Sequence, residues 1–219
     1  MKKELDYSLV REQMVRRQIA GRGISDPRVL KAMREIKRHE FVAIEQTSFA
    51  YDDGPMSIGH GQTISQPYIV AWMTELLEVE SDMKVLEVGT GCGYQTAVLA
   101  RLARYVFSIE RIEALARQAQ INLRRADVNN VSLKVGDGAE GWPECAPFPR
   151  ILVAAAPSEI PPALLSQLAP GGVLVSPVGP RSMQEMIRIR KREDGELARE
   201  NLGAVSFVPL LQGAKRDSA

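Results

Sequence analysis

A glycine-rich turn between a predicted strand and a predicted helix restricts this chain more than any other segment. The residues Lys84-Val85-Leu86-Glu87-Val88 have the apolar, branched character of a buried strand, and Gly89-Thr90-Gly91-Cys92-Gly93 follows them. A helix-compatible run begins at Gln95. Glycine accepts positive φ and lets a ligand approach the backbone, while a helix N-terminus offers unpaired N–H groups. The pattern therefore predicts a cofactor-binding turn.

The glycine spacing and two acidic residues favour a nucleoside cofactor that is not a dinucleotide. A dinucleotide fingerprint requires Gly-x-Gly-x-x-Gly, but here the third glycine comes one residue early and Tyr94 takes its position. Glu87 would repel a pyrophosphate and suits a cation, such as the ammonium group of S-adenosylmethionine. Glu110 ends the next predicted strand, where an acid accepts hydrogen bonds from ribose hydroxyls. A turn used only for packing and a solvated glutamate are the alternatives.

Composition indicates one ordinary globular domain. The 219 residues allow a sizeable core, and 45% of them are hydrophobic. A net charge of +1 gives no support for a general nucleic-acid binder. Two cysteines, Cys92 and Cys145, are too few for a disulfide framework, which indicates a reducing compartment. No apolar run approaches the roughly 18 residues of a membrane span. We therefore expect a cytoplasmic monomer without membrane or nucleic-acid partners.

Two segments precede the glycine turn. Residues 1–50 are predicted to form a helical extension, with one helix over 8–20 and a second opened by Asp26-Pro27. Residues 51–67 are predicted to be a long loop that carries the substrate site. Within that loop, Ser65 could cap the following helix, contact the substrate, or do both.

The rest of the chain predicts a mostly parallel, doubly wound sheet over residues 68–182, because strands and helices alternate there. Residues 183–212 are predicted to add an antiparallel strand pair. The basic residues of 188–192 are interpreted as the solvated face of an edge strand, with a nucleic-acid patch as the alternative. The strands expected after the glycine turn span 105–110, 131–135, 151–157, 173–178, 186–192 and 205–210.

Seven segments occur in the order typical of one family. They are Gly59-x-Gly61-Gln62-Thr63-Ile64-Ser65-x-Pro67, Val85-Leu86-Glu87-Val88-Gly89-Thr90-Gly91, Ser108-Ile109-Glu110-Arg111, Gly136-Asp137-Gly138, Gly141-Trp142, Ala146-Pro147-Phe148 and Phe207-Val208-Pro209-Leu210. With them the chain closely resembles the protein-L-isoaspartate O-methyltransferase family over nearly its full length. The resemblance implies a Rossmann-like methyltransferase fold.

The resemblance also implies methyl transfer from S-adenosylmethionine to the free α-carboxylate of an isoaspartyl residue in a damaged protein, with S-adenosylhomocysteine as product and a succinimide on the repair path. That carboxylate is already ionised at neutral pH, so no general base is needed. By the same resemblance Ser65 is the active-site residue and no metal is required. The implied cofactor residues are Glu87, Gly89, Thr90, Gly91, Gly93, Glu110, Arg111, Asp137 and Gly138, and the implied substrate residues are Ile58, His60, Gln62, Thr63 and Ile64.

Three positions depart from the family pattern. Cys92 replaces a small hydroxyl residue, Pro149-Arg150 stands where the family has an aspartate, and Ala154 replaces a threonine. Two other functions stay open. An amide- or adenine-methylating enzyme would carry Asn/Asp-Pro-Pro-Tyr, which the residues 155–157 do not match. A non-catalytic cofactor-binding protein that associates with RNA would fit the departure at Arg150, but the intact Ser65 segment argues against it.

Overall fold

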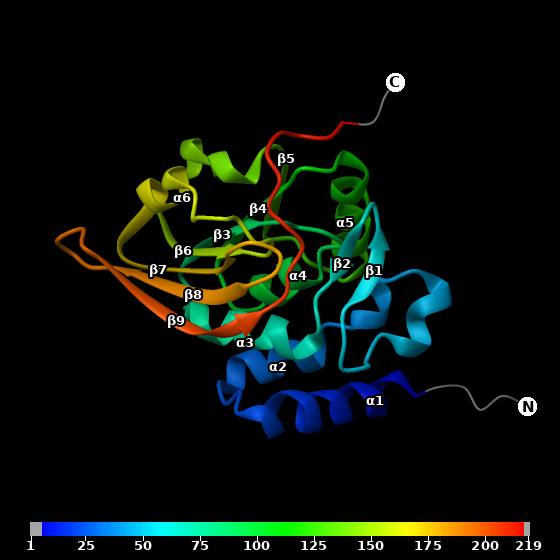
Figure 1. Cartoon of the computed structure of the whole chain (residues 1–219). Coiled ribbons are helices and arrows are strands. Elements are labelled where there is room, and N and C mark those ends of the chain that lie inside the picture. Colours follow the sequence, from blue (N-terminus) through cyan, green and yellow to red (C-terminus); the bar gives the residue numbers. More distant parts are fainter. Residues whose placement is uncertain (1–5, 217–219) are drawn as a thin grey trace, which may run out of the picture.

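A seven-stranded sheet forms the centre of the computed structural model, which describes residues 6–216 (Figure 1). The first five strands in the sheet are parallel, and the last two are antiparallel, as the sequence predicts. Their order across the sheet is β5 (Val131–Val135), β4 (Tyr105–Glu110), β3 (Lys84–Val88), β6 (Phe148–Val153), β7 (Leu168–Val178), β8 (Gln184–Lys191) and β9 (Leu197–Val205).

The strand order reverses at β3. The chain proceeds outward from β3 through β4 to β5, and it then returns to place β6 on the other side of β3. In open α/β sheets, ligands bind outside the carboxyl ends of the strands at such a reversal. The glycine turn follows β3 directly, so the fold puts the predicted cofactor-binding turn at this position.

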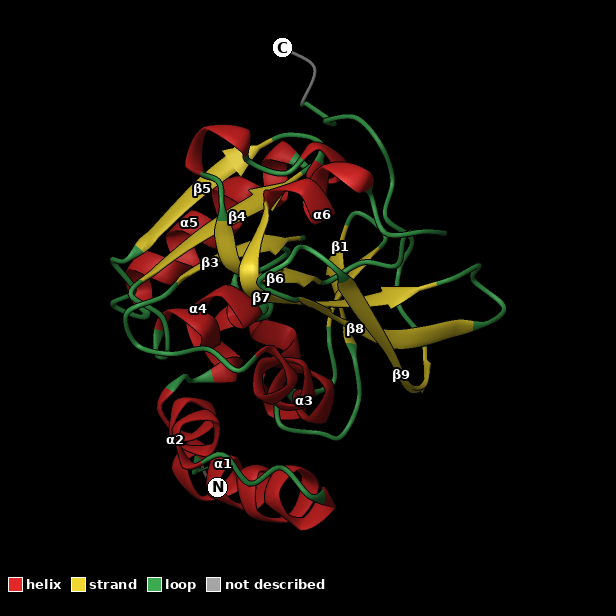
Figure 2. Cartoon of the chain, turned by 90° about the vertical axis from the view of Figure 1, so that its left-hand side faces the viewer, coloured by secondary structure: helices red, strands yellow, loops and turns green. Residues whose placement is uncertain are grey.

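Both faces of the sheet are covered, because neighbouring residues of each central strand enter different cores. Val85 belongs to the core formed with α3 (Pro67–Leu77) and α4 (Tyr94–Ala100), whereas Leu86 belongs to the core beneath α6 (Pro162–Gln167). The first core also includes residues of α5 (Glu113–Arg125) and of the helical extension. Figure 2 shows the extension and α3 stacked on one side of the sheet.

The helical extension follows the prediction closely. The helix expected over 8–20 is present as α1 (Tyr7–Gln13), which continues through a π-helical turn and a short 3-10 turn to Gly23, where φ is 100°. The predicted start of α2 (Pro27–Glu35) is confirmed, because Asp26 Oδ1 accepts a hydrogen bond from the Arg28 N–H at 2.8 Å. Elsewhere in the described chain, four further 3-10 segments span Arg38–Phe41, Ile44–Phe49, Gly138–Glu140 and Pro143–Cys145.

The segment predicted as a loop over 51–67 is more ordered than expected. It contains a hairpin of β1 (Met56–Gly59) and β2 (Gln62–Ile64), in which Gly59 pairs with Gln62. The two connecting residues, His60 and Gly61, have φ of 54° and 72°, as a tight turn between twisted strands requires. The glycines that suggested a loop are the residues that close this hairpin.

The strand predicted over 205–210 is wrong. β9 begins at Leu197, which pairs with Lys191, and it ends at Val205, which pairs with Gln184, the first residue of β8. Residues 206–215, called here the C-terminal segment, instead cross the carboxyl ends of the parallel strands (red in Figure 1). Pro209 has no N–H to donate to a strand ladder. The strand predicted over 151–157 is also shifted, since β6 spans 148–153.

Candidate functional site

The glycine turn has the conformation that its sequence predicts. Gly89, Gly91 and Gly93 have φ of 97°, 56° and 88°, values that other residues rarely adopt. Gly93 is the N-cap of α4, so the unpaired N–H groups of the first helical turn lie next to the glycines. The Gly91 N–H donates to Glu110 Oε2 at 2.8 Å. This bond joins the turn to the end of β4.

Glu110 is fixed at the position expected of a ribose-binding acid. Its other oxygen, Oε1, accepts a hydrogen bond from the Ile112 N–H at 2.9 Å, and only 5% of the residue is exposed. Two backbone donors hold the carboxylate in one orientation. Its remaining lone pairs can accept hydrogen bonds from ligand hydroxyls.

Glu87 lies beneath the turn. Its Oε2 accepts hydrogen bonds from Thr96 at 2.5 Å and from Ser108 at 2.6 Å, and the Ser108 hydroxyl also contacts the Thr90 hydroxyl at 2.6 Å. Glu87 Oε1 is buried and has no hydrogen-bond partner among the described residues. Burial raises the pKa of this carboxyl to about 7.

Three adjoining cavities lie along the carboxyl ends of the strands, and Thr63 and Ala154 line all of them. The first cavity is bounded by the glycine turn, Glu110, Gly138 and residues 208–211 of the C-terminal segment. The middle cavity lies between the glycine turn and α3. The third, called here the cleft, lies between α3 and the end of β9. Ser65 lines both the middle cavity and the cleft.

This arrangement brings most of the predicted cofactor residues together. Gly89, Gly91, Glu110, Arg111 and Gly138 line the first cavity, and Gly89, Thr90 and Gly91 line the middle one. The position of Gly138 excludes any side chain, because a Cβ there would lie 2.3 Å from Val88 Cγ1. Glu87 and Gly93 are not among the residues that line the three cavities. Glu87 supports the turn from beneath through Thr96 and Ser108, and Gly93 connects the turn to α4.

Asp137 has partners that the sequence did not indicate. Its Oδ1 accepts a hydrogen bond from the Ala139 N–H at 2.8 Å, and its Oδ2 accepts one from the Gly213 N–H at 2.7 Å. Arg111 Nε donates to the Gly213 carbonyl oxygen at 3.2 Å. Both side chains therefore hold the C-terminal segment over the first cavity. The role of Asp137 as a cofactor residue stays a prediction.

The five predicted substrate residues separate into four positions. Gln62 and Thr63 line the first cavity, and Ile64 lines the middle one. His60 is exposed at the tip of the hairpin, outside the lining of the three cavities. Ile58 lines a separate cavity behind the hairpin, and its Cδ1 would lie 3.3 Å from a Cβ at Gly91.

Ser65 is not the N-cap of α3. That position belongs to Gln66, with Pro67 as the first helical residue and no side-chain capping bond. The expectation that Ser65 caps the helix is therefore wrong, because the chain needs one more extended residue between the hairpin and Pro67. The Ser65 hydroxyl therefore does not cap the helix. It lies where the middle cavity meets the cleft, since Ser65 lines both.

The departure at Arg150 lies away from the site. Arg150 is at the amino end of β6, where Nε donates to the Glu78 carbonyl oxygen at 2.9 Å and one terminal nitrogen donates to the Pro149 carbonyl oxygen at 2.7 Å. Ala154 follows the carboxyl end of the same strand, and its Cβ would lie 3.5 Å from a Cβ at Gly89. The other two departures, Ala154 and Cys92, both belong to the site, because each lines the middle cavity.

The sequence reasoning missed several residues that line the cleft. Arg22 comes from the helical extension, and Tyr68 and Trp72 lie one turn apart on α3. The spacing of four between the two aromatic residues could have suggested a shared face. The contribution of Arg22 had no such signal, because it depends on how the extension packs on α3.

Residues 6–216 contain neither a cluster of metal-ligating side chains nor a membrane-spanning helix. No group of three or more His, Cys, Asp or Glu side chains among them could hold a metal ion. No helix within the same range has the length and apolar character needed to cross a bilayer.

Comparisons with known proteins agree on one family. A family model described as protein-L-isoaspartate(D-aspartate) O-methyltransferase matches residues 9–215. A protein-L-isoaspartate O-methyltransferase of Trichlorobacter lovleyi is 52% identical over 94% of this chain and 95% of its own. One from Methanoculleus marisnigri is 54% identical over 92% of this chain and 91% of its own.

Solved structures give the same result. A protein-L-isoaspartate O-methyltransferase structure has a TM-score of 0.81 and 29% identity over 91% of this chain, which covers 65% of that longer chain. A Plasmodium falciparum structure, described as a protein of this kind and complexed with S-adenosyl-L-homocysteine, has a TM-score of 0.80 and 26% identity over 95% of this chain and 99% of its own.

Proposed function

The chain belongs to the protein-L-isoaspartate(D-aspartate) O-methyltransferase family, and we propose that its three adjoining cavities hold S-adenosylmethionine next to an isoaspartyl residue. The activity is methylation of the isoaspartyl α-carboxylate, which starts the repair of a damaged protein. The first and middle cavities would take the cofactor, and the cleft would take the damaged peptide. The observation that carries this assignment is that Ser65 lines the middle cavity and the cleft together.

The residues present fit the cofactor. The positive-φ glycines and the start of α4 offer backbone N–H groups to its methionine part, and the fixed carboxylate of Glu110 suits its ribose. Gly138 lines the first cavity at a position where a Cβ would collide with Val88. Val208 and Leu210 would cover the adenine side. When bound, S-adenosylmethionine supplies a methyl group on a positively charged sulfur.

The substrate needs no general base. A peptide α-carboxylate has a reference pKa of about 3.5, so it is ionised at neutral pH and can attack directly. No histidine is among the residues that line the three cavities: His60 is at the hairpin tip, and His39 stacks on Tyr7 at 4.1 Å. The chain would act by orienting the carboxylate and by excluding water. The Ser65 hydroxyl would donate a hydrogen bond to one carboxylate oxygen and leave the other free to attack.

The test is transfer of labelled methyl from S-adenosylmethionine to one peptide made in isoaspartyl and aspartyl forms. We expect base-labile label on the isoaspartyl form only. Ser65→Ala should lower kcat/KM by about tenfold to a hundredfold, the effect of one hydrogen bond to a charged group. Ser57→Ala is the matched control, since Ser57 lies on the same hairpin but lines the cavity behind it. Unchanged transfer by Ser65→Ala would remove the proposed role of that hydroxyl.

We also propose that the protein acts as a cytoplasmic monomer without a nucleic-acid partner. Both cysteines are free thiols, which suits a reducing compartment. The prediction that residues 188–192 lie on an edge strand is wrong, because β8 pairs with β7 on one side and β9 on the other. The basic side chains of β8 that could have bound RNA are largely neutralised: Arg188 pairs with Glu200 at 2.6 Å, and Arg190 pairs with Glu78. Sedimentation at micromolar concentration and a salt-dependent RNA-binding assay test these two statements. Tight, salt-sensitive RNA binding would favour the non-catalytic alternative.

A further inference from the structure

We propose that the cleft selects isoaspartyl residues whose neighbours in the peptide are acidic, through Arg22 and Arg181. This inference rests on the proposed function and adds a substrate class to it. Among the described residues that line the cleft, Arg22 and Arg181 are the only ones whose side chains carry a full charge. Both charges are positive, and any peptide that brings a carboxylate to Ser65 must enter this cleft.

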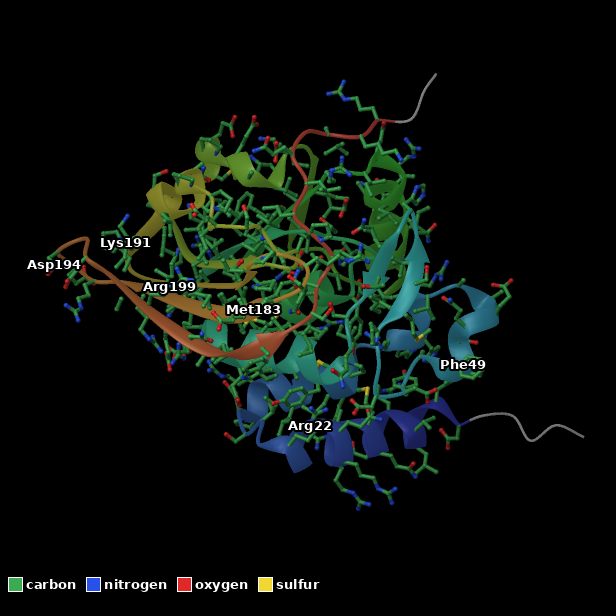
Figure 3. The ribbon with its side chains drawn as sticks, viewed as in Figure 1. Arg22, Phe49, Met183, Lys191, Asp194 and Arg199 are labelled. Carbon is green, nitrogen blue, oxygen red and sulfur yellow. The ribbon has the colours of Figure 1, made fainter. Side chains whose placement is uncertain are left out.

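Arg22 is held in place by its neighbours. Its guanidinium carbon lies 3.8 Å above the centre of the Tyr68 ring, and Tyr68 is stacked on Trp72 at 6.2 Å. This is the geometry of a cation–π contact, which keeps the charge on the surface of the cleft. Figure 3 shows Arg22 on the helical extension, next to α3.

The charge of Arg22 stays available to a ligand. Its partner Asp53 lies 3.3 Å away and does not line the cleft, and the side chain of Arg22 is 43% exposed. Asp53 is also held by the Gln66 amide, which donates to its Oδ1 at 2.7 Å. Because Arg22 lines the cleft and is partly exposed, a peptide carboxylate in the cleft can approach its guanidinium.

Arg181 adds a second cation from a different part of the chain. It is exposed in the connection between β7 and β8, whereas Arg22 comes from the helical extension. Between them the cleft is lined on the side of β9 by uncharged residues, namely Leu202, Ala204, Val205, Ser206 and Phe207. A peptide lying in the cleft thus meets positive charge and no negative charge.

The expected effect is moderate and sensitive to salt. A unit charge about 7 Å from a guanidinium in a solvated cleft is worth roughly a factor of two to three in binding, and salt screens it over about 8 Å at physiological ionic strength. Two arginines should make a peptide with acidic neighbours a better substrate than one with basic neighbours by about threefold to tenfold at low salt.

The experiment compares three isoaspartyl peptides that differ only in two flanking residues: both Glu, both Gln or both Lys. We expect kcat/KM to fall in that order at low ionic strength. The differences should shrink in 0.5 M salt, because the Debye length is then only a few ångströms, roughly 4 Å. Arg181→Gln and Arg22→Gln should each reduce the Glu-to-Lys ratio, and Arg22→Lys should largely retain it.

Arg199→Gln is the matched control, because Arg199 is an exposed arginine of β9 that does not line the cleft (Figure 3). It should leave the ratio unchanged. Methylation of the Gln-flanked peptide with equal kcat/KM for all three peptides would overturn the inference and leave the proposed function standing. A ratio that falls as much in Arg199→Gln as in Arg181→Gln would also overturn it. Failure to methylate any of the three peptides would count against both.

Discussion

Glu87 combines two roles that are usually separate: it supports a ligand-binding turn, and it is a fully buried acid. Thr96 and Ser108 both donate to the same oxygen, and the other oxygen has no partner among the described residues. Burial holds the pKa of this carboxyl at about 7, compared with 4.5 for an unperturbed glutamate. A carboxyl of this kind affects the free energy of unfolding at physiological pH.

The sign of that effect follows from proton binding. Between pH 4.5 and pH 7 the unfolded chain loses this proton before the folded protein does, so Glu87 makes unfolding easier as pH rises through that range. Glu87→Gln resembles the protonated form at every pH. We expect the variant to gain about 3 kcal/mol of unfolding free energy relative to the natural protein between pH 5 and pH 8.

Urea unfolding of both proteins at the two pH values measures this gain. Glu159→Gln, at an exposed residue between β6 and α6, is a control for the loss of one surface carboxylate. A difference between Glu87→Gln and the natural protein that is the same at pH 5 and pH 8 would contradict the raised pKa.

For single residues, the sequence predicted those roles that depend on local backbone structure. Gly89, Gly91 and Glu110 follow from spacing along one strand–turn–helix unit, and all three line the first cavity. Asp137 could not be understood in the same way. One of its two partners is Gly213, 76 residues away in the chain. Which side of the hairpin Ile58 faces likewise depends on tertiary packing.

Among the elements, the C-terminal segment covers the first cavity and is held there by isolated bridges and hydrogen bonds. Val208, Pro209, Leu210 and Leu211 line the first cavity, yet the segment forms no regular strand. It is attached by backbone contacts, including those of the Lys215 N–H with the Arg111 carbonyl oxygen at 2.6 Å and of Gly213 with Asp137. Such a segment can open without unfolding the sheet.

Removing the attachment of the C-terminal segment should weaken cofactor binding more than it lowers the free energy of unfolding. A chain ending at Gln212 loses the contacts of Gly213 and Lys215, whereas a chain ending at Arg216 keeps them. We expect the shorter chain to bind S-adenosylhomocysteine about tenfold more weakly, the effect of one or two hydrogen bonds. Titration calorimetry of the two chains makes the comparison. Equal affinities would show that the attachment does not matter for the cofactor.

The order of strands and helices in the core could be predicted, because period-two and period-3.6 patterns are local. The hairpin of β1 and β2 was missed for a physical reason: its turn residues resemble those of an open loop, and its strands are four and three residues long. The strand wrongly expected over 205–210 has a suitable composition. In the structure residues 206–210 pair through one parallel bridge, between Pro209 and Ala156, and such a contact depends on tertiary packing that the sequence does not reveal.

At the scale of the whole molecule, the larger of the two cores is continuous from the helical extension to the sheet. Met14, Val29 and Met33 of the extension belong to the same cluster of buried residues as Val85 and Leu99. The Tyr94 hydroxyl donates to Met33 Sδ at 3.9 Å, and Phe41 meets the Tyr94 ring edge-on at 5.5 Å. The first helical residue after the glycine turn thus packs directly against the extension.

We therefore propose that the protein unfolds as one cooperative unit. Met33→Ala removes a side chain that is 0% exposed and should cost about 2 to 5 kcal/mol. Tryptophan fluorescence and far-UV circular dichroism should report coincident urea transitions for this variant and for the natural protein. Leu9→Ala, at a residue that is 59% exposed, should change stability by about 0.5 kcal/mol or less. Separate transitions by the two probes would indicate that the extension unfolds independently.

The position of Thr63 and Ala154, which line all three cavities, has a consequence for inhibitor chemistry. A single molecule that links an adenosine to a short peptide could pass between these two residues and occupy both substrate sites at once. Tethering makes the second binding event intramolecular, so such a bisubstrate compound could exceed the affinity of either half by about a hundredfold or more. A larger residue in place of Ala154 would narrow that passage and confer resistance to the linked compound before it abolished binding of either half.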